Sequence, residues 1–232
     1  MPVVIHEFAD HAALDAALSE VVAQRLSQSI SERGRASLVV SGGRTPVGFF
    51  HALSRVKLLW REVTVALADE RWVAPDHPDS NEALVTSQLM QSEAKLARLL
   101  GVANTAASVA QGAANATAHL STLPRPFDVV VLGMGNDGHT ASLFPDAPEL
   151  AQAFATDQSP AYVAVTPSHA PHARVSLNAA ALLDSRCIAL HVTGEDKRKI
   201  LEHAMRPGAV SELPVRILWQ NSETPVHVYW AP

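Results

Sequence analysis

The sequence is poor in residues that cross-link a protein internally. Its 232 residues include a single cysteine, Cys187, and no group of cysteines and histidines has the spacing of a zinc finger. One cysteine excludes an internal disulfide, and the missing spacing predicts no structural metal. We therefore expect a protein of a reducing, cytoplasmic compartment.

Long hydrophobic runs are also missing. A transmembrane helix needs about 20 consecutive apolar residues, and no run of the sequence approaches that length. The opening segment, MPVVIHEFADHAALDAAL, lacks the basic stretch and the unbroken apolar core of a signal peptide. The sequence therefore predicts neither a membrane span nor a secretion signal.

The sequence has no excess of positive charge. Lysine and arginine number 18 against 23 aspartate and glutamate residues, which gives a net charge of −5. Overall electrostatics is therefore not expected to attract nucleic acid or an anionic membrane, and neither is predicted as a partner. An anionic ligand would have to be held by a local cluster of cations.

The composition is that of a folded protein. Hydrophobic residues make up 47% of the chain and charged residues 18%, which excludes wholesale disorder. The length suits a single domain over residues 1–232. Because there is no internal repeat, linker or heptad array, the sequence predicts no second domain and no particular oligomeric state.

Short apolar runs alternate along the chain with longer stretches of helical period. We expect strands at Val3–Phe8, Leu38–Val40, Val63–Ala68, Val129–Leu132, Tyr162–Val165 and Ile188–Val192, and further ones at Val175–Leu177 and Val226–Trp230. We expect helices at Asp10–Arg33, Pro46–Leu53, Asn81–Met90, Ala106–Leu120 and Lys197–Met205, while Leu213–Trp219 suits either a strand or a short helix. This alternation predicts an α/β fold with a mainly parallel sheet and helices on both faces.

Polar residues gather directly after four of the expected strands. They occupy 41–46, 69–71, 133–139 and 194–197. Each segment alone is also explained as an ordinary turn. Because ligands of open parallel sheets bind beyond the carboxyl ends of the strands, the concentration of polar residues there predicts one site.

The first of these segments, SGGRTP, suits an anion-binding turn. Its glycines free the backbone, Thr45 is expected to cap the following helix, and Pro46 suits the first helical position. A Walker A loop is excluded because Phe49 and Phe50 stand where lysine and serine or threonine are needed. A strand–helix turn without a ligand remains the alternative.

The third segment satisfies G-x-G-x-x-G at Gly133–Gly138 but does not suit a dinucleotide. Asp137 and His139 intrude, and Pro145 and Pro148 interrupt the helix that a dinucleotide fold needs. A glycine-rich loop that presents His139 fits better, because histidine exchanges a proton near neutral pH. A histidine that only caps a helix or bonds a carbonyl is the alternative.

The remaining histidines and cations are weighed by context. His169 and His172 lie among prolines and serine, where an exposed loop is expected rather than a metal site. Four cations near predicted strand ends suggest a phosphate monoester as ligand, although each alone is more often a solvated surface charge. These cations are Arg44, Arg71, Arg174 and Lys197.

Several segments resemble those of the 6-phosphogluconolactonases, the lactonase family of the pentose phosphate pathway. They are SGGRTP at 41–46, ADERWVAPDHPDSN at 68–81 and GMGNDGHTASLFP at 133–145, with ARVSLN at 173–178 and GEDK at 194–197 in support. The resemblance implies a Rossmann-like α/β fold shared with the glucosamine-6-phosphate deaminases. It also implies a small-molecule substrate, the sugar-phosphate lactone 6-phospho-D-glucono-1,5-lactone, and no cofactor.

The resemblance extends to single residues. His139 resembles the family's base, and Arg71 resembles the arginine that reaches the bound anion. Arg44 departs from the serine that is frequent at its position. The rest of the expected binding pocket comprises Ser41, Gly42, Gly43, Arg44, Thr45, Asp69, Asn136, Arg174 and Lys197.

These assignments lead to a mechanistic hypothesis. His139 takes the proton of a water molecule that attacks C1 and returns it to the departing ring oxygen, with Asp137 or Asp69 orienting the imidazole. No G-x-S-x-G elbow is present, so no covalent intermediate is expected.

Three other functions are weighed against this one. Deaminases of the related family carry the segment A-F-N-E-P after their histidine. Residues 141–145 of this chain read ASLFP instead and offer no carboxylate. A sugar-phosphate sensor would keep the pocket without its chemistry and would usually add a further domain. A dinucleotide oxidoreductase would need the nucleotide loop that the third segment lacks.

Overall fold

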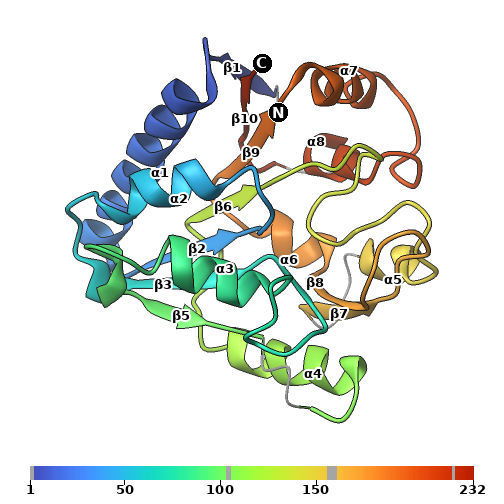
Figure 1. The fold of residues 1–232 in the computed structure, drawn as a ribbon, viewed down its shortest axis with the longest axis horizontal. Coiled ribbons are helices and arrows are strands. Elements are labelled where there is room, and N and C mark those ends of the chain that lie inside the picture. The colour runs from blue at the N-terminus through green and yellow to red at the C-terminus, as the bar shows by residue number, and fades with distance from the viewer. Residues whose placement is uncertain (1–2, 103–105, 156–160, 221–222) are drawn as a thin grey trace.

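A large parallel sheet forms the centre of the molecule. The structure is a computed structural model that describes residues 3–102, 106–155, 161–220 and 223–232. Among these residues, seven strands form a sheet in the order β1-β10-β9-β6-β2-β3-β5, and every neighbouring pair is parallel. The expected α/β fold with a mainly parallel sheet is confirmed (Figure 1).

The bounds of the elements are as follows. The strands are β1 (Val4–Glu7), β2 (Ala36–Val40), β3 (Val63–Leu67), β4 (Asp69–Arg71), β5 (Arg98–Leu100), β6 (Val129–Leu132), β7 (Tyr162–Val165), β8 (Arg174–Leu177), β9 (Ile188–Thr193) and β10 (Val226–Ala231). The helices are α1 (His11–Arg33), α2 (Val47–Ser54), α3 (Asn81–Gln88), α4 (Val109–Leu120), α5 (Leu150–Ala153), α6 (Ala179–Leu183), α7 (Glu195–Ala204) and α8 (Ile217–Gln220). Short 3₁₀ turns are η1 (Trp60–Glu62), η2 (Ala94–Leu96) and η3 (Pro214–Arg216).

The continuous apolar runs of the central strands are explained by burial on both faces of the sheet. Along β6, Val129 and Val131 pack into a core shared with α1 and α2, whereas Val130 and Leu132 pack into a second core with α4 and α6. Side chains of a strand alternate between its faces, so each face needs its own apolar residues. Figure 1 shows α1 and α2 together on one face of the sheet.

A second, smaller sheet corrects the expected arrangement. Strands β4, β8 and β7 pair antiparallel, so Tyr162–Val165 is not a member of the parallel sheet. The expected strand Val63–Ala68 ends at Leu67, and the chain then enters the second sheet at Asp69–Arg71. Ala68 joins the two sheets, since its amide donates to a β2 carbonyl and its carbonyl accepts from the amide of Leu177.

The helices follow their local signals, with a few corrections. Asp10 caps α1 through the amide of Ala13, and Gly34 ends the helix in the left-handed region at φ 71°. Ser80 caps α3, and its side chain accepts the amide of Ala83. The ambiguous segment Leu213–Trp219 forms η3 followed by α8 and no strand.

The strand order places a crevice at the carboxyl end of β2. The chain moves from β2 to β3 on one side and later adds β6 on the other side, so the loops that follow β2 and β6 separate there.

Cys187 lies elsewhere, at the entry to interior strand β9, and is 2% exposed. No helix of the described residues is both long and apolar enough to span a bilayer.

Candidate functional site

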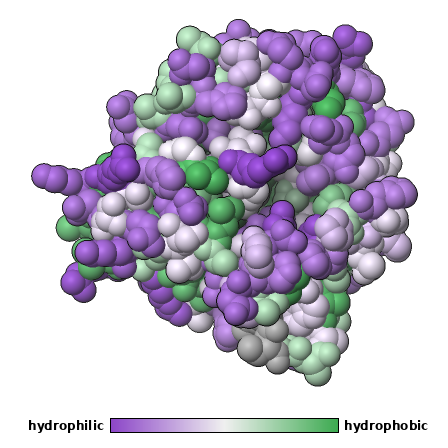
Figure 2. Space-filling model, in the orientation of Figure 1, coloured by the Kyte–Doolittle hydropathy of each residue, from purple (hydrophilic) through white to green (hydrophobic). Residues whose placement is uncertain are grey.

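The polar segments that follow four strands meet at one cavity. It has a volume of about 400 Å³, which lies within the usual range for small-molecule sites. Figure 2 shows a hollow near the middle of a largely hydrophilic face. Nine of the predicted site residues line the cavity: Ser41, Gly42, Gly43, Arg44, Thr45, Asp69, Arg71, His139 and Lys197.

The loop after β2 offers backbone donors to the cavity. Within the described residues, no hydrogen bond is made by the amides of Gly42 and Gly43. Thr45 does not cap the helix as expected, because α2 begins at Val47 and its N-cap is Pro46, without a side-chain hydrogen bond. The correction follows from Pro46, whose φ of −79° and ψ of 0° already extend the helical turn.

The loop after β6 presents a histidine–aspartate pair. The Nδ1 of His139 lies 2.5 Å from Oδ1 of Asp137, which also accepts the backbone amide of His139 at 3.1 Å. Burial raises the pKa of Asp137, but the hydrogen bond and charge of His139 outweigh burial and hold that pKa below its ordinary value. An ionised Asp137 fixes the proton on Nδ1 and leaves Nε2 as the basic nitrogen.

The glycines of this loop make room for the imidazole. A Cβ on Gly135 would lie 2.2 Å from Nδ1 and Cε1 of His139, so a larger residue would displace the ring. The ring packs on Phe144 with centroids 4.3 Å apart, and the His139 side chain is 29% exposed. Residues 133–138 form turns and no helix, which agrees with the rejection of a dinucleotide loop.

Positive charge predominates on the cavity wall. Arg44 is exposed, whereas Arg71 and Lys197 are half-buried. Partial burial and the nearby charge of Arg44 lower the pKa of Lys197, which indicates that both cations serve one region of the cavity. Asp69 is the carboxylate among the described lining residues, and its Oδ2 accepts a hydrogen bond of 2.6 Å from the Ser142 hydroxyl.

Three predicted residues do not line the cavity. Asp137 contacts it through His139, and Asn136 is exposed in the same loop. Arg174 is buried, and its Nη1 donates to the carbonyls of Pro171 and His172 beneath the loop before β8. The structure therefore places Arg174 as a support of that loop, and its expected contact with an anion stays a prediction.

Two lining residues with polar side chains were missed by the sequence analysis. His191 is 2% exposed, and burial lowers its pKa to about 4. Its Nε2 lies 3.4 Å from Oδ1 of Asp15 without hydrogen-bond geometry. Asn81 donates from Nδ2 to the carbonyl of Asp69. A histidine inside an apolar strand could have marked the first, because buried polar groups require an explanation.

A buried glutamate builds the wall behind Arg71. Glu70 is fully buried, and its carboxylate accepts the amides of Arg71, Asn81 and Glu82 at 2.7 Å each. Burial outweighs these hydrogen bonds and raises the pKa of Glu70. The side chain thus holds β4 against the start of α3, which is a structural task.

Comparison with known sequences gives a consistent result. The sequence pattern of the family described as glucosamine-6-phosphate isomerases/6-phosphogluconolactonase matches residues 9–230. A 6-phosphogluconolactonase of Mesorhizobium japonicum is 44% identical, and the alignment covers 97% of this chain and 94% of that protein.

Comparison with solved structures agrees. The crystal structure of a 6-phosphogluconolactonase from Shewanella baltica is 43% identical and superposes with a TM-score of 0.97 over 100% of this chain and 98% of that chain. A monomeric glucosamine-6-phosphate deaminase, 17% identical, has a TM-score of 0.81 over 99% of this chain and 97% of its own and shares the fold alone.

Proposed function

This chain belongs to the family of glucosamine-6-phosphate isomerases and 6-phosphogluconolactonases, and from that premise we propose that it hydrolyses 6-phospho-D-glucono-1,5-lactone to 6-phosphogluconate. Lactone hydrolysis, a step of the pentose phosphate pathway, is the activity carried by the relatives that match it at nearly full length. The observation that carries the proposal is a cavity in which His139, hydrogen-bonded to Asp137, shares the wall with three cations.

The His139–Asp137 pair supplies the proposed chemistry. Nε2 of His139 takes a proton from water as the water oxygen bonds to C1 of the lactone. When the tetrahedral intermediate collapses, the C1–O5 bond breaks and the imidazolium returns the proton to O5. Asp137 stabilises the imidazolium through its hydrogen bond to Nδ1, which is 2.5 Å long.

The phosphate is assigned to the cationic side of the cavity. Arg44, Arg71 and Lys197 line it, and a dianionic phosphate is the group that several cations of an acidic chain suit. Because the 6-phosphate is remote from C1, this binding supplies orientation of the reacting carbon. The open amides of Gly42 and Gly43 add neutral donors for an anionic oxygen.

The proposal includes a location and a set of partners. The substrate is a phosphorylated metabolite, and the single cysteine of the chain is free and buried, which suits the cytoplasm. The net charge of −5 gives no support to a nucleic-acid partner. We propose that residues 1–232 act as one lactonase domain, since the family pattern extends over 9–230.

The alternatives have less support. Phe144 packs against the His139 ring at the position where the deaminase segment A-F-N-E-P has its glutamate. The carboxylate that would assist ring opening of an amino sugar is therefore missing from this position. A sensor without chemistry has no need of the His139–Asp137 hydrogen bond.

The activity is tested on freshly made substrate. Glucose-6-phosphate dehydrogenase and NADP generate the lactone, and its disappearance is compared with spontaneous hydrolysis. Release of ammonia from glucosamine 6-phosphate is measured in parallel. We expect accelerated loss of the lactone and no ammonia. Ammonia release, or a rate of lactone loss equal to the spontaneous one, would contradict the proposal.

A further inference from the structure

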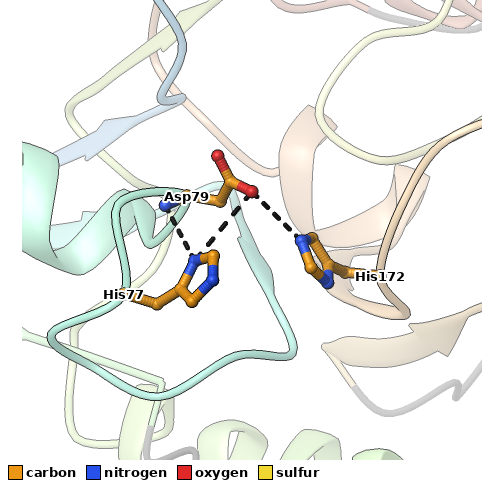
Figure 3. Close-up of side chains that lie close together, drawn as sticks. All are labelled: His77, Asp79 and His172. Carbon is orange, nitrogen blue, oxygen red and sulfur yellow. Dashed lines mark hydrogen bonds and ion pairs between the residues drawn. The ribbon is translucent and has the colours of Figure 1, made fainter.

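A cluster of possible metal ligands lies outside the cavity. His77 and Asp79 belong to the loop after β4, and His172 belongs to the loop before β8 (Figure 3). One ligand atom from each side chain lies within 4.8 Å of the others. Sequence spacing gave no sign of this group, because 93 positions separate Asp79 from His172.

Both imidazoles of the cluster face the same carboxylate oxygen. The Oδ2 of Asp79 lies 3.1 Å from Nε2 of His172 and 3.9 Å from Nδ1 of His77. The rings meet edge to face, with centroids 5.5 Å apart. The three side chains therefore bring their ligand atoms together in one place.

The imidazole of His77 presents a nitrogen lone pair inside the cluster. Its Nδ1 accepts a hydrogen bond of 3.0 Å from the backbone amide of Asp79, so this nitrogen carries no proton. Metal ligation needs a neutral imidazole with a free lone pair. An entering ion would take the place of this backbone hydrogen bond and of the hydrogen bond between Nε2 of His172 and Oδ2 of Asp79.

Arginines hold the backbone of the cluster from both sides. The Nη1 of Arg71 donates to the carbonyl of Asp79 at 2.6 Å. On the opposite loop, Nη1 of the buried Arg174 donates to the carbonyl of His172 at 2.8 Å. His172 adopts φ 67°, a left-handed conformation that is unfavourable for a non-glycine residue. Such strain persists where the surrounding structure fixes it, and it is common at ligand sites.

We propose that His77, Asp79 and His172 bind a zinc ion that links the loop after β4 to the loop before β8. Two imidazoles and one carboxylate form a donor set that zinc accepts, with water in the fourth position. The imidazole nitrogens of His172 and His77 lie 3.1 and 3.9 Å from Oδ2 of Asp79. Small movements of the side chains would place an ion between these atoms at Zn–N and Zn–O distances of about 2.0–2.2 Å. The side chains are 30–52% exposed, so an ion can enter from solvent.

The proposed ion is a structural bridge. None of the three ligands lines the cavity, so the ion lies apart from the reacting carbon. Its nearest connection to the cavity is Arg71, which lines the wall and holds the carbonyl of Asp79. The site goes beyond the proposed function and does not depend on which sugar phosphate the cavity takes.

Metal titration of the full chain tests the site. Protein made without a histidine tag is stripped with a chelator, desalted and titrated with Co²⁺, whose visible absorption reports its ligands, and with Zn²⁺ in a calorimeter. We expect one equivalent to bind. His172→Ala and Asp79→Asn should each weaken binding at least about tenfold, the smaller end of the loss seen even for supporting residues of metal sites.

His169→Ala is the matched control. His169 lies in the same loop, its side chain is 89% exposed, and it is outside the cluster. This variant should bind Co²⁺ and Zn²⁺ as the unaltered protein does. Circular dichroism establishes that each variant is folded, and Zn²⁺ should raise the thermal midpoint of the unaltered protein and of His169→Ala but not of His172→Ala. Equal binding by all variants, or no binding by the unaltered protein, would overturn the proposal.

Discussion

At the scale of the residue, the proposed mechanism gives the two nitrogens of one imidazole separate tasks. Asp137 holds Nδ1 of His139, and Nε2 is left for proton transfer at the cavity. A base that is oriented in this way loses no hydrogen bond when it becomes charged, because the carboxylate then faces a full positive charge. Nearby Asp69 is bound to Ser142 instead, so the choice between the two carboxylates favours Asp137 as the orienting group.

Removal of the base is the first test at this scale. We expect His139→Ala to lower kcat by about 10²–10⁴-fold while KM changes little, because a general base acts in the transition state. Steady-state kinetics on fresh lactone give both constants. His169→Ala, altered in an exposed loop, should keep the kcat of the unaltered enzyme. Unchanged turnover in His139→Ala would remove this residue from the mechanism.

Removal of a cation should act on binding instead. We expect Arg71→Ala to raise KM by roughly tenfold or more, which corresponds to about 1.4 kcal/mol of lost interaction. The lactone without a phosphate should be a poor substrate of the unaltered enzyme and should be affected less by the substitution. Equal rates with the two lactones would remove the phosphate from the recognition of the substrate.

Buried His191 predicts a loss of stability in acid. Its pKa is about 4 in the folded protein and about 6.5 when unfolded, so the unfolded chain binds more protons between these values. The stabilisation is complete above pH 6.5 and falls as the pH drops, by up to about 3 kcal/mol near pH 4. Urea unfolding of His191→Asn should show a shallower loss over this window. Parallel profiles for the variant and the unaltered protein would contradict the assignment.

At the scale of the element, helix ends are fixed by short local signals. Helix α1 runs from the cap at Asp10 to Gly34, whose amide donates to the carbonyl of Ile30. The cap conformation at φ 71° is one that glycine adopts without strain. Such signals lie within a few residues of each other, so the sequence alone predicted both ends of this helix.

The end of α1 offers a test of stability. We expect Gly34→Ala to lower the free energy of unfolding by about 1 kcal/mol, since no atom contacts the added Cβ and only backbone strain acts. Denaturant unfolding measures the change. Ser31→Ala, exposed in the last turns of the same helix, should leave stability unchanged or slightly higher. A loss in Ser31→Ala as large as that in Gly34→Ala would refute the strain argument.

Elements held by distant partners were harder to predict. The segment Asp69–Arg71 is polar and three residues long, and it becomes a strand because β8 pairs with it. The run Tyr162–Val165 forms a strand as predicted. It pairs antiparallel with β8 in the small sheet, however, and does not join the large parallel sheet. Short polar strands carry no periodicity, so their pairing depends on contacts that the sequence does not display.

The site shows the same division between local and distant signals. His139 and the loop at 41–46 follow strands directly, so chain order alone brought them to one edge of the sheet. His191 was missed because it stands at a core position of an apolar strand. Its place on the cavity wall results from the neighbours of β9 in the fold. Arg174 was assigned to the pocket from its segment; its side chain supports the loop before β8, and its contact with an anion stays a prediction.

At the scale of the whole molecule, the cavity joins the two sheets. The loop after β2 and the loop after β6 come from the parallel sheet, and Asp69 and Arg71 come from the small one. A ligand that contacts both sheets opposes their separation. Its binding free energy is therefore added to the stability of the complete fold.

This linkage predicts stabilisation by the product. At a 6-phosphogluconate concentration 100 times its Kd, we expect the free energy of unfolding to rise by about 2.7 kcal/mol. Thermal or urea unfolding with and without the product gives the change. Arg71→Ala, measured at the same concentration, should gain much less. Equal gains in the two proteins would mean that the product binds away from this cavity.

The burial of Cys187 makes its thiol a reporter of how often the large sheet opens. The thiol sits where the chain enters an interior strand of the large sheet, and burial raises its pKa, so both access and reactivity are suppressed in the native state. An alkylating reagent meets this sulfur only after β9 has parted from its neighbours. The rate of labelling by such a reagent therefore depends on how often the central sheet opens and not on the motions of surface loops.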